Sequence, residues 1–227
     1  MLSKGIAPRL PFASTRRAGT PWMTRADGRC RRCRRSRHNA MTRQLAGTHE
    51  GDGPPMARTL LALLVPEAER VVGSFRDAYD PSARRGLGAH ITLIYPFIDS
   101  ELLTPTMLAR VRDIAADIPA PMFRLVEVKT FPSVVWLAPE PAKPIIQIAT
   151  ALERAFPDHP KGGGAFPDFI PHLSVARHIQ QEKVAVVNEL QARLADHGPI
   201  YGWCESMSLL VSENRRWREL AQYPFLH

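Results

Sequence analysis

Two short segments of the chain repeat one pattern, and this repeat limits the possible folds more than any other feature. His90-Ile91-Thr92-Leu93 and His172-Leu173-Ser174-Val175 each run histidine, apolar, hydroxyl, apolar, and each follows a loop-like stretch. In a β-strand, alternate side chains point to the same face. The histidine and the hydroxyl should therefore share one face, while the apolar residues pack against a core on the other. The repeat predicts two strands, each with one buried and one polar face.

The rest of the regular pattern mixes strands with helices. Short turn-like connections join several of the expected strands, which favours an α+β fold over a doubly wound parallel sheet. Each repeated segment is followed by a helix, which indicates two lobes of similar build. We expect strands at 59–65, 90–95, 122–129, 134–138, 172–176, 203–212 and 217–223, and helices from 66 to about 80 and over 104–117, 144–156 and 182–196.

The positive charge of the chain is concentrated at its N-terminus. The formal net charge is +8, from 30 Lys and Arg and 22 Asp and Glu. Residues 1–55 contain 12 of the basic and 3 of the acidic residues, a net charge of +9, which leaves −1 for residues 56–227. This distribution argues against a broad basic surface that grips a long nucleic acid, and it leaves open a small basic patch in a cleft.

Residues 1–55 are rich in Arg, Pro, Gly, Ser and Thr and have no helical or strand period. We expect them to be a disordered tail, and residues 56–227 to form the domain. Three interpretations remain open: the true start of translation is Met56, the tail is an Arg-rich transit peptide, or residues 29–37 bind nucleic acid or direct nuclear import. We favour the first, because the regular pattern begins directly after Met56.

The cysteines and the apolar runs indicate the setting in which the protein works. Cys30 and Cys33 form a single C-x-x-C, a weak zinc or redox signal without a second pair, and Cys204 stands alone. No apolar run approaches the roughly 20 residues of a transmembrane helix. We therefore expect a cytoplasmic monomer with no metal, no cofactor and no membrane partner.

The two repeated segments carry the residue types that acid–base chemistry at phosphorus requires. Histidine titrates near neutrality, so a pair can take one proton and give another. The Thr92 and Ser174 hydroxyls can donate hydrogen bonds to phosphate oxygens, and this scheme needs no metal. One such strand is more often purely structural, but two with the same apolar frame favour a function. The other histidines lack a comparable hydroxyl partner and are interpreted as surface residues: His38, His49, His159, His178, His197 and His227.

Residues 90–97 and 171–177 resemble the paired motifs of the two-histidine phosphoesterase superfamily, most closely its 2′-5′ RNA ligase-like, or RNA 2′,3′-cyclic phosphodiesterase, branch. The resemblance covers roughly residues 57–225. Ser174 stands where many members have Thr, which keeps the hydroxyl. The resemblance implies a bilobal α+β fold with two antiparallel-rich sheets, helices outside, and the two motifs facing each other across a central groove.

The resemblance also implies an activity. It implies the opening of 2′,3′-cyclic phosphates on RNA ends or small nucleotides to 2′-phosphates and, in some members, reversible 2′-5′ joining of RNA ends. His90 would be the proton donor to the leaving oxygen, and His172 the acceptor that activates water. One alternative is a binding module that holds RNA ends or nucleotides without turnover. Another is an unrelated α+β domain with a nucleic-acid-binding tail.

Several other residues are weaker candidates for the site. Arg177 could contact substrate, but strict alternation places it opposite His172 and Ser174, so it would need a β-bulge or the end of the strand to reach them. Tyr95 has the same difficulty. The remaining candidates are the aromatics Phe131, Trp136 and Phe166, for which core packing is favoured over base stacking, and Gly162–Gly164, which is favoured as a flexible loop.

Overall fold

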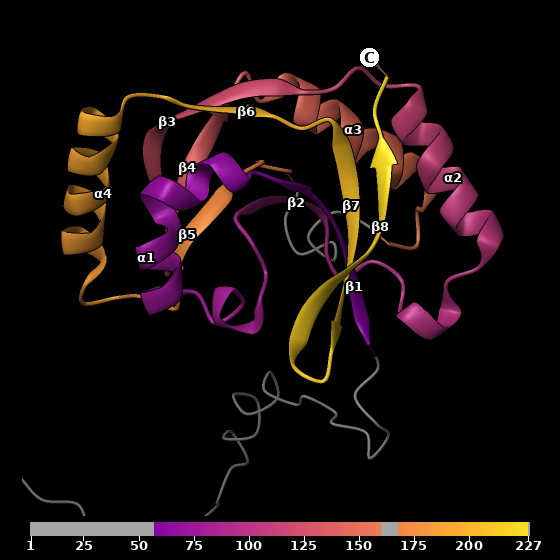
Figure 1. Ribbon diagram of the computed structural model, residues 1–227, viewed down its shortest axis with the longest axis horizontal. Coiled ribbons are helices and arrows are strands. Elements are labelled where there is room, and N and C mark those ends of the chain that lie inside the picture. The colour runs from indigo at the N-terminus through magenta and orange to yellow at the C-terminus, as the bar shows by residue number, and fades with distance from the viewer. Residues whose placement is uncertain (1–56, 160–167, 227) are drawn as a thin grey trace, which may run out of the picture. The chain divides into compact units, whose positions relative to one another are not determined.

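The computed structural model describes residues 57–159 and 168–226. Within them the chain forms an eight-stranded antiparallel sheet, four α-helices and three short 3-10 helices (Figure 1). The strands are β1 (Arg58–Leu64), β2 (His90–Ile94), β3 (Met122–Phe131), β4 (Val134–Glu140), β5 (Leu173–Arg177), β6 (Ile200–Trp203), β7 (Ser206–Glu213) and β8 (Arg216–Pro224). The helices are α1 (Glu69–Tyr79), α2 (Pro105–Ala116), α3 (Lys143–Ala155), α4 (Lys183–His197), η1 (Pro66–Ala68), η2 (Ala83–Arg85) and η3 (Ser100–Leu102).

The strand order across the sheet is β6-β3-β4-β5-β2-β1-β7-β8. It divides into two four-stranded parts, which we call the His172 half (β6, β3, β4, β5) and the His90 half (β2, β1, β7, β8). The α+β class is confirmed. The two expected sheets are the two halves of a single sheet, because Ile91 of β2 pairs with Leu173 of β5 and joins them.

One face of the sheet carries the main core. Leu61 and Leu63 of β1, Ile91 of β2 and Leu173 of β5 are all 0% exposed and belong to one hydrophobic cluster. These residues occupy alternate positions on their strands, as the repeated pattern predicts. The alternate positions therefore lie on the opposite face, which carries Thr92 of β2 and a second, smaller hydrophobic cluster that includes Leu60 and Ala62 of β1.

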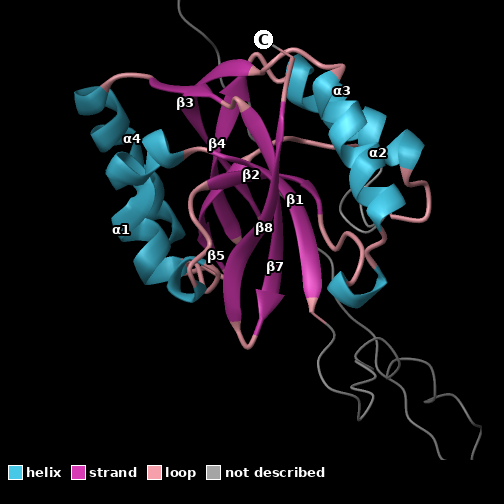
Figure 2. Ribbon diagram, turned by 45° about the vertical axis from the view of Figure 1, so that its right-hand side comes forward, coloured by secondary structure: helices cyan, strands magenta, loops and turns pink. Residues whose placement is uncertain are grey.

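The helices pack on the two halves separately. α1 contacts β5 and α4 contacts β3 and β4, whereas α3 contacts β2 and α2 contacts β8. Figure 2 shows α1 with α4 beside one half of the sheet and α2 with α3 beside the other. Each pair contributes buried residues at helical spacing, such as Ile145, Ile148 and Leu152 of α3. The expected arrangement, with helices outside the strands, is confirmed.

The expected helices and strands are present, with two differences. Pro66 begins the 3-10 turn η1, and the α-helix starts only at Glu69. β6 was not expected as a separate strand, because Gly202 interrupts its short apolar pattern. Gly202 allows Phe123 of β3 to pack flat against the strand, since a Cβ at this position would lie 2.5 Å from the phenyl ring.

Several expectations concern residues outside the described ranges. They are the expectation of a disordered tail over 1–55 and those for the Cys30 and Cys33 pair, Gly162–Gly164 and Phe166. Over the described ranges, no helix combines the length and the apolar character needed to cross a membrane.

Candidate active site

β2 and β5 lie side by side, and their pairing brings the two repeated segments together. Ile91 pairs with Leu173 in antiparallel register, and both are fully buried. Since antiparallel strands run in opposite directions, each histidine lies opposite the hydroxyl residue of the other strand. Extending the register from this pair places His90 opposite Ser174 and His172 opposite Thr92. All four side chains are partly exposed on the face opposite the core.

Both imidazoles make the same kind of hydrogen bond, to the backbone carbonyl oxygen two residues earlier in the chain. Nδ1 of His90 lies 2.8 Å from the Gly88 carbonyl oxygen, and Nδ1 of His172 lies 2.8 Å from the Ile170 carbonyl oxygen. A carbonyl oxygen only accepts, so in each ring Nδ1 carries the hydrogen and donates it. This leaves Nε2 of each neutral imidazole with a free lone pair, the state of a general base.

The surroundings of both histidines disfavour the charged imidazolium. Burial lowers the pKa of His90 to about 4; the positive charges of Arg76 and Arg177 act in the same direction, and the Gly88 hydrogen bond and the Asp80 carboxylate oppose it. Burial also lowers the pKa of His172, again with a contribution from Arg177. In the free protein both rings are therefore neutral at pH 7, and an anion bound between them would raise both pKa values.

A β-bulge in β5 moves Arg177 onto the histidine-bearing face. Trp136 of β4 pairs with Ser174, but the next residue of β4, Val135, pairs with Ala176. The extra residue in β5 shifts the alternation by one, and Val134 then pairs with Arg177 on the same face as Ser174. The β-bulge that Arg177 needs to reach the histidine face is therefore present. The charge of Arg177 lowers the pKa of both histidines.

β2 carries a bulge at the equivalent position. Thr92 pairs with Ala62 of β1, whereas Ile94 pairs with the adjacent Leu61. Tyr95 therefore follows on the same face as Thr92, where its ring lies 6.0 Å from that of Trp217 in β8. Tyr95 and Arg177 occupy matching positions, each the third residue after the motif hydroxyl.

Two aromatic side chains pack against His172. The rings of Phe131 and Trp136 are stacked with centroids 4.8 Å apart, and their centroids lie 5.3 Å and 5.5 Å from that of His172. Trp136 is 4% exposed, so it is buried as expected, but on the histidine face, where it forms a wall of the site beside Ser174. Phe131 is only partly buried and belongs to neither hydrophobic cluster, so the core packing expected for it is wrong. Its Nε1 is buried without a hydrogen-bond partner. Residues 134–138 are all apolar, so their pattern carries no signal for this second role.

The described residues offer little for metal or thiol chemistry. In residues 57–159 and 168–226, no group of three or more His, Cys, Asp or Glu side chains is arranged to hold a metal ion. Cys204 is buried, and burial, with a smaller contribution from Glu67, raises the pKa of its thiol to about 12. This thiol is poorly suited to act as a nucleophile.

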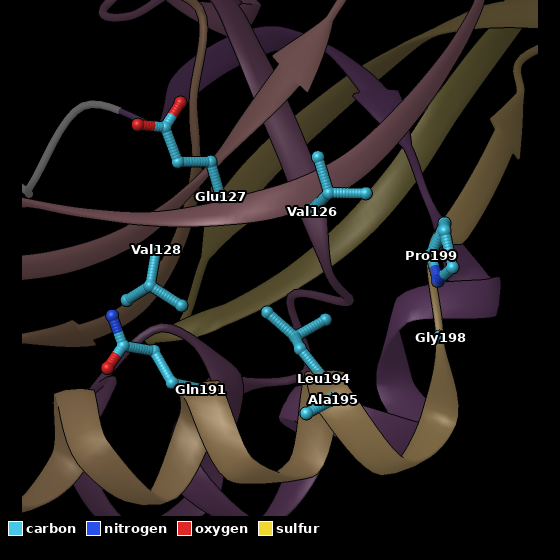
Figure 3. Close-up of a pocket in the computed structure, with 8 residues that line it drawn as sticks. All are labelled: Val126, Glu127, Val128, Gln191, Leu194, Ala195, Gly198 and Pro199. Atoms are coloured by element: carbon cyan, nitrogen blue, oxygen red, sulfur yellow. The ribbon is translucent and has the colours of Figure 1, made fainter. Parts of the chain in front are cut away.

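Two cavities lie away from the histidines. One of about 500 Å³ lies between β3 and the end of α4, and is lined by residues that include Val128, Gln191 and Leu194 (Figure 3). A second of about 660 Å³ lies at β6 and is lined by Tyr201 and Trp203 among others. Neither is lined by His90, Thr92, His172, Ser174 or Arg177.

Comparison with known proteins identifies the family. A model of the 2′-5′ RNA ligase superfamily matches residues 64–216, which is more than half of the chain and includes both motifs. The chain belongs to this superfamily. Membership indicates a phosphoesterase-type function. A comparison with curated proteins found no match.

Solved structures of similar fold include TT0787 from Thermus thermophilus, with a TM-score of 0.50 and 18% identity over 74% of this chain and 97% of that one. E. coli LigT in its apo form matches with a TM-score of 0.48 and 19% identity over 75% of this chain and 98% of that one. LigT complexed with 3′-AMP matches with a TM-score of 0.48 and 18% identity, over 76% and 99%. At these identities the TT0787 match supports the fold alone.

Proposed function

We propose that this protein is a metal-independent cyclic phosphodiesterase that opens 2′,3′-cyclic phosphates of RNA ends or small nucleotides to 2′-phosphates. One observation carries the proposal. The antiparallel pairing of Ile91 with Leu173 sets two histidines and two hydroxyls on one face, in a nearly symmetrical arrangement. Membership of the 2′-5′ RNA ligase superfamily supports the same reaction class.

The proposed reaction uses one histidine on each side of the phosphorus atom. Nε2 of His172 accepts a proton from water while the water oxygen attacks phosphorus. The bond between phosphorus and O3′ breaks, and His90 in its protonated form gives its Nε2 proton to O3′. The products are a 2′-phosphate and a free 3′-hydroxyl, so the reaction consumes one water and needs no further reactant.

The hydroxyls and Arg177 are suited to stabilise the phosphate. The Thr92 and Ser174 hydroxyls can donate hydrogen bonds to the non-bridging oxygens, where charge builds as water adds. Arg177 follows Ser174 on the same face and supplies a permanent positive charge. Its positive charge favours an anionic ligand over a neutral one at this face.

The proton-transfer roles follow from the family resemblance. The lowered pKa values of the histidines add one requirement to these roles. Both histidines have a lowered pKa in the free protein, so a donor must gain its proton when the anionic substrate binds. The phosphate charge opposes the effect of burial and raises both pKa values. We therefore expect a bell-shaped dependence of kcat on pH, with one limb for each histidine.

The decisive experiment is hydrolysis of 2′,3′-cyclic AMP and of an RNA ending in a cyclic phosphate by the full-length protein in EDTA. The expected product is the 2′-phosphate, identified by chromatography against both positional isomers. His90→Ala and His172→Ala should each abolish most of the activity, whereas His197→Ala, at the exposed end of α4, should not. Strict dependence on added metal, or full activity of either site variant, would refute the proposal.

A substrate screen should then define the chemical class. Cyclic phosphate ends of tRNA fragments, ADP-ribose cyclic phosphate and 2′-5′ linked oligonucleotides all fit the same acid–base groups. The last class also tests the reverse joining reaction, which would return a 2′-5′ linkage from a cyclic phosphate and a 5′-hydroxyl. Tight binding of these ligands without any product would instead establish the non-catalytic binding module.

A further inference from the structure

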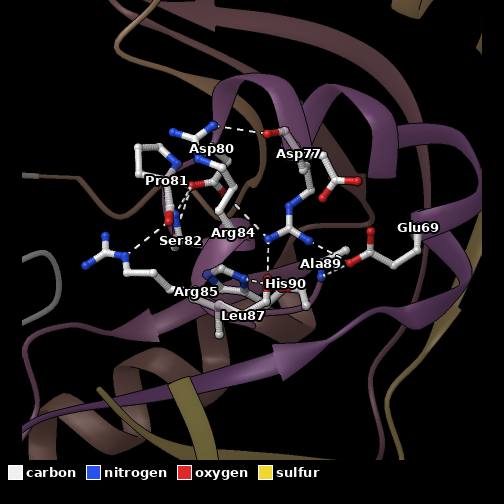
Figure 4. Close-up of polar contacts among 12 residues, drawn as sticks. Glu69, Asp77, Asp80, Pro81, Ser82, Arg84, Arg85, Leu87, Ala89 and His90 are labelled. Carbon is white, nitrogen blue, oxygen red and sulfur yellow. Dashed lines mark hydrogen bonds and ion pairs between the residues drawn. The ribbon is translucent and has the colours of Figure 1, made fainter. Parts of the chain in front are cut away.

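An ion cluster around a buried arginine lies along α1, from its first residue to the residue after its end, next to the loop that leads into β2 (Figure 4). Arg76 is 1% exposed, and its Nη1 donates to Glu69 Oε1 at 2.6 Å. Its Nη2 lies 3.4 Å from Asp80 Oδ2 and donates to the Leu87 carbonyl oxygen at 2.6 Å. We call Glu69, Arg76 and Asp80 the Arg76 cluster. The proposed reaction makes no direct use of it.

The Arg76 cluster holds the backbone on both sides of Gly88. Arg76 binds the carbonyl of Leu87, and the Glu69 carboxylate accepts a hydrogen bond from the backbone N–H of Ala89. Gly88 lies between these two contacts, and its own carbonyl oxygen accepts the hydrogen from Nδ1 of His90. Two anchors, one residue on either side, therefore fix the group that orients the imidazole.

Asp80 anchors the start of the same loop. Its Oδ1 accepts hydrogen bonds from the backbone N–H and the hydroxyl of Ser82, and Asp80 is 1% exposed. These hydrogen bonds and the positive charges of Arg76 and Arg177 keep the pKa of Asp80 below its usual value despite burial. Asp80 is therefore an ionised partner for Arg76 at neutral pH. A buried charge of this kind is costly unless it is paired, so the cluster is stable only as a unit.

The orientation of His90 matters because only one tautomer serves the proposed reaction. With hydrogen on Nδ1, Nε2 is available to exchange a proton with the substrate. If the Gly88 carbonyl moved away, the neutral ring would distribute between both tautomers and could rotate. Groups that hold a reacting side chain through its other nitrogen have effects of about 10–100-fold in metal sites, where the same geometry occurs.

We propose that the Arg76 cluster is a positioning device that fixes the Gly88 carbonyl and thereby keeps His90 in its Nδ1–H tautomer. Its importance for turnover rests on the proposed function, but its effect on the tautomer does not. His172 has its own carbonyl partner, Ile170, and lies against Phe131 and Trp136. Loss of the cluster should therefore change His90 and leave His172 unchanged.

The test is nuclear magnetic resonance of the full-length protein labelled with ¹⁵N at histidine. Two-bond ¹H–¹⁵N correlations show which ring nitrogen carries the hydrogen, and the His90 signal is assigned by its loss in His90→Ala. Wild type should show Nδ1–H for both His90 and His172. Arg76→Met and Glu69→Ala should shift His90 toward a mixture of tautomers, while His172 keeps its spectrum.

Activity with 2′,3′-cyclic AMP supplies the second measurement. Arg76→Met should lower kcat about 10–100-fold with KM changed less than about threefold, and Arg76→Lys should recover part of the loss. Glu69→Ala is the second variant in case Arg76→Met does not fold, since the Glu69 side chain is 41% exposed. Arg112→Met, which removes an exposed ion pair with Asp113, is the matched control and should change nothing.

The outcomes separate the two proposals. An unchanged His90 tautomer in a folded Arg76→Met or Glu69→Ala variant overturns the positioning role. A wild-type protein that is inactive on every cyclic phosphate overturns the proposed function, while the tautomer measurement still decides the role of the Arg76 cluster. Equal changes at His90 and His172 would mean a general loss of structure and would also overturn the positioning role.

Discussion

The His90 half and the His172 half of the sheet share one framework but surround their histidines differently. In each half a histidine begins the motif, its Nδ1 donates to the carbonyl two residues earlier, and a bulge follows the hydroxyl. The residue paired with the hydroxyl is Ala62 in the His90 half and Trp136 in the His172 half. The residue that the bulge turns to the histidine face is Tyr95 in one half and Arg177 in the other.

This comparison separates framework from chemistry. The framework places two imidazoles in equivalent positions, which by itself would make them interchangeable. The residues around it break that equivalence. The backbone before His90 is held by the Arg76 cluster, whereas His172 lies against aromatic rings. The positive charge of Arg177 belongs to one half only, yet it lowers the pKa of both histidines.

The largest effect should come from removing either histidine. His90→Ala and His172→Ala should each lower kcat/KM about 10²–10⁴-fold, because each removes one proton transfer. The double variant should have a kcat/KM only slightly below that of the less active single variant, since acid and base act as a unit. Initial rates with 2′,3′-cyclic AMP measure both effects. Multiplicative losses in the double variant would mean that the two histidines act independently.

The next largest effect concerns stability in acid. The pKa of His90 is about 4 in the folded protein and about 6.5 when unfolded, so the unfolded chain binds the proton more readily between these values. The free energy of unfolding should fall by up to about 3 kcal/mol as the pH drops from 6.5 to 4, and the His90 contribution should level off below pH 4. Urea unfolding at pH 7, 5.5 and 4.5 measures this slope.

Substituting each histidine shows which of the two causes the loss of stability in acid. The pKa is lowered further at His90 than at His172, so His90→Gln should flatten the pH dependence more than His172→Gln. Asp80, whose pKa is lowered, also loses stabilising effect in acid, but it is present in both variants and so does not affect the comparison between them. Equal flattening by both variants would contradict the electrostatic difference between the halves.

A smaller effect should separate the two bulge residues. Arg177→Met should lower kcat/KM about tenfold or more, since a hydrogen bond to a charged group contributes about 1.5–3 kcal/mol. It should also raise the pKa of both histidines, which moves the acid limb of the pH–rate profile to higher pH. Tyr95→Phe keeps the ring against Trp217 and should change kcat/KM less than about twofold. The opposite ranking would reverse the proposed roles of these residues.

Exchanging one hydroxyl residue for the other should also have a small effect. Thr92→Ser and Ser174→Thr keep the donor and should retain activity within about threefold, whereas Ser174→Ala should lose about tenfold. Ser174→Thr should cost more than Thr92→Ser, because its added methyl group meets Trp136 whereas Thr92 lies opposite Ala62. Rates of the three variants at saturating substrate test this order.

Much of the secondary structure could be predicted from the sequence. The 3.6-residue period located the buried side of α2, where Val111 and Ala115 are 0% exposed, and Thr104 caps the helix by accepting from Met107 N at 3.2 Å. β6 escaped prediction because a four-residue strand containing glycine has almost no local signal. The packing of Gly202 under Phe123 defines that strand, and Phe123 is far away in the chain.

The candidate site was predictable in its residues but not in its geometry. Strand alternation alone indicated that His90 and Thr92 share a face, and likewise His172 and Ser174. The same rule placed Arg177 on the wrong face, because a bulge depends on how the neighbouring strand pairs. The contribution of Arg76 had no signal in the sequence at all, since an arginine in a helix reads as a surface charge until its partners are known.

The sequence by itself determined the two histidine and hydroxyl motifs, their buried backing and the positions of most helices and strands, because these follow from periodicities of two and 3.6 residues along one segment. Only the tertiary structure decided that β2 pairs with β5, that both strands bulge after the hydroxyl, and that a buried arginine anchors the loop before His90. Hydrogen bonds and ion pairs between distant segments set those features, and their energies depend on which residues meet across space.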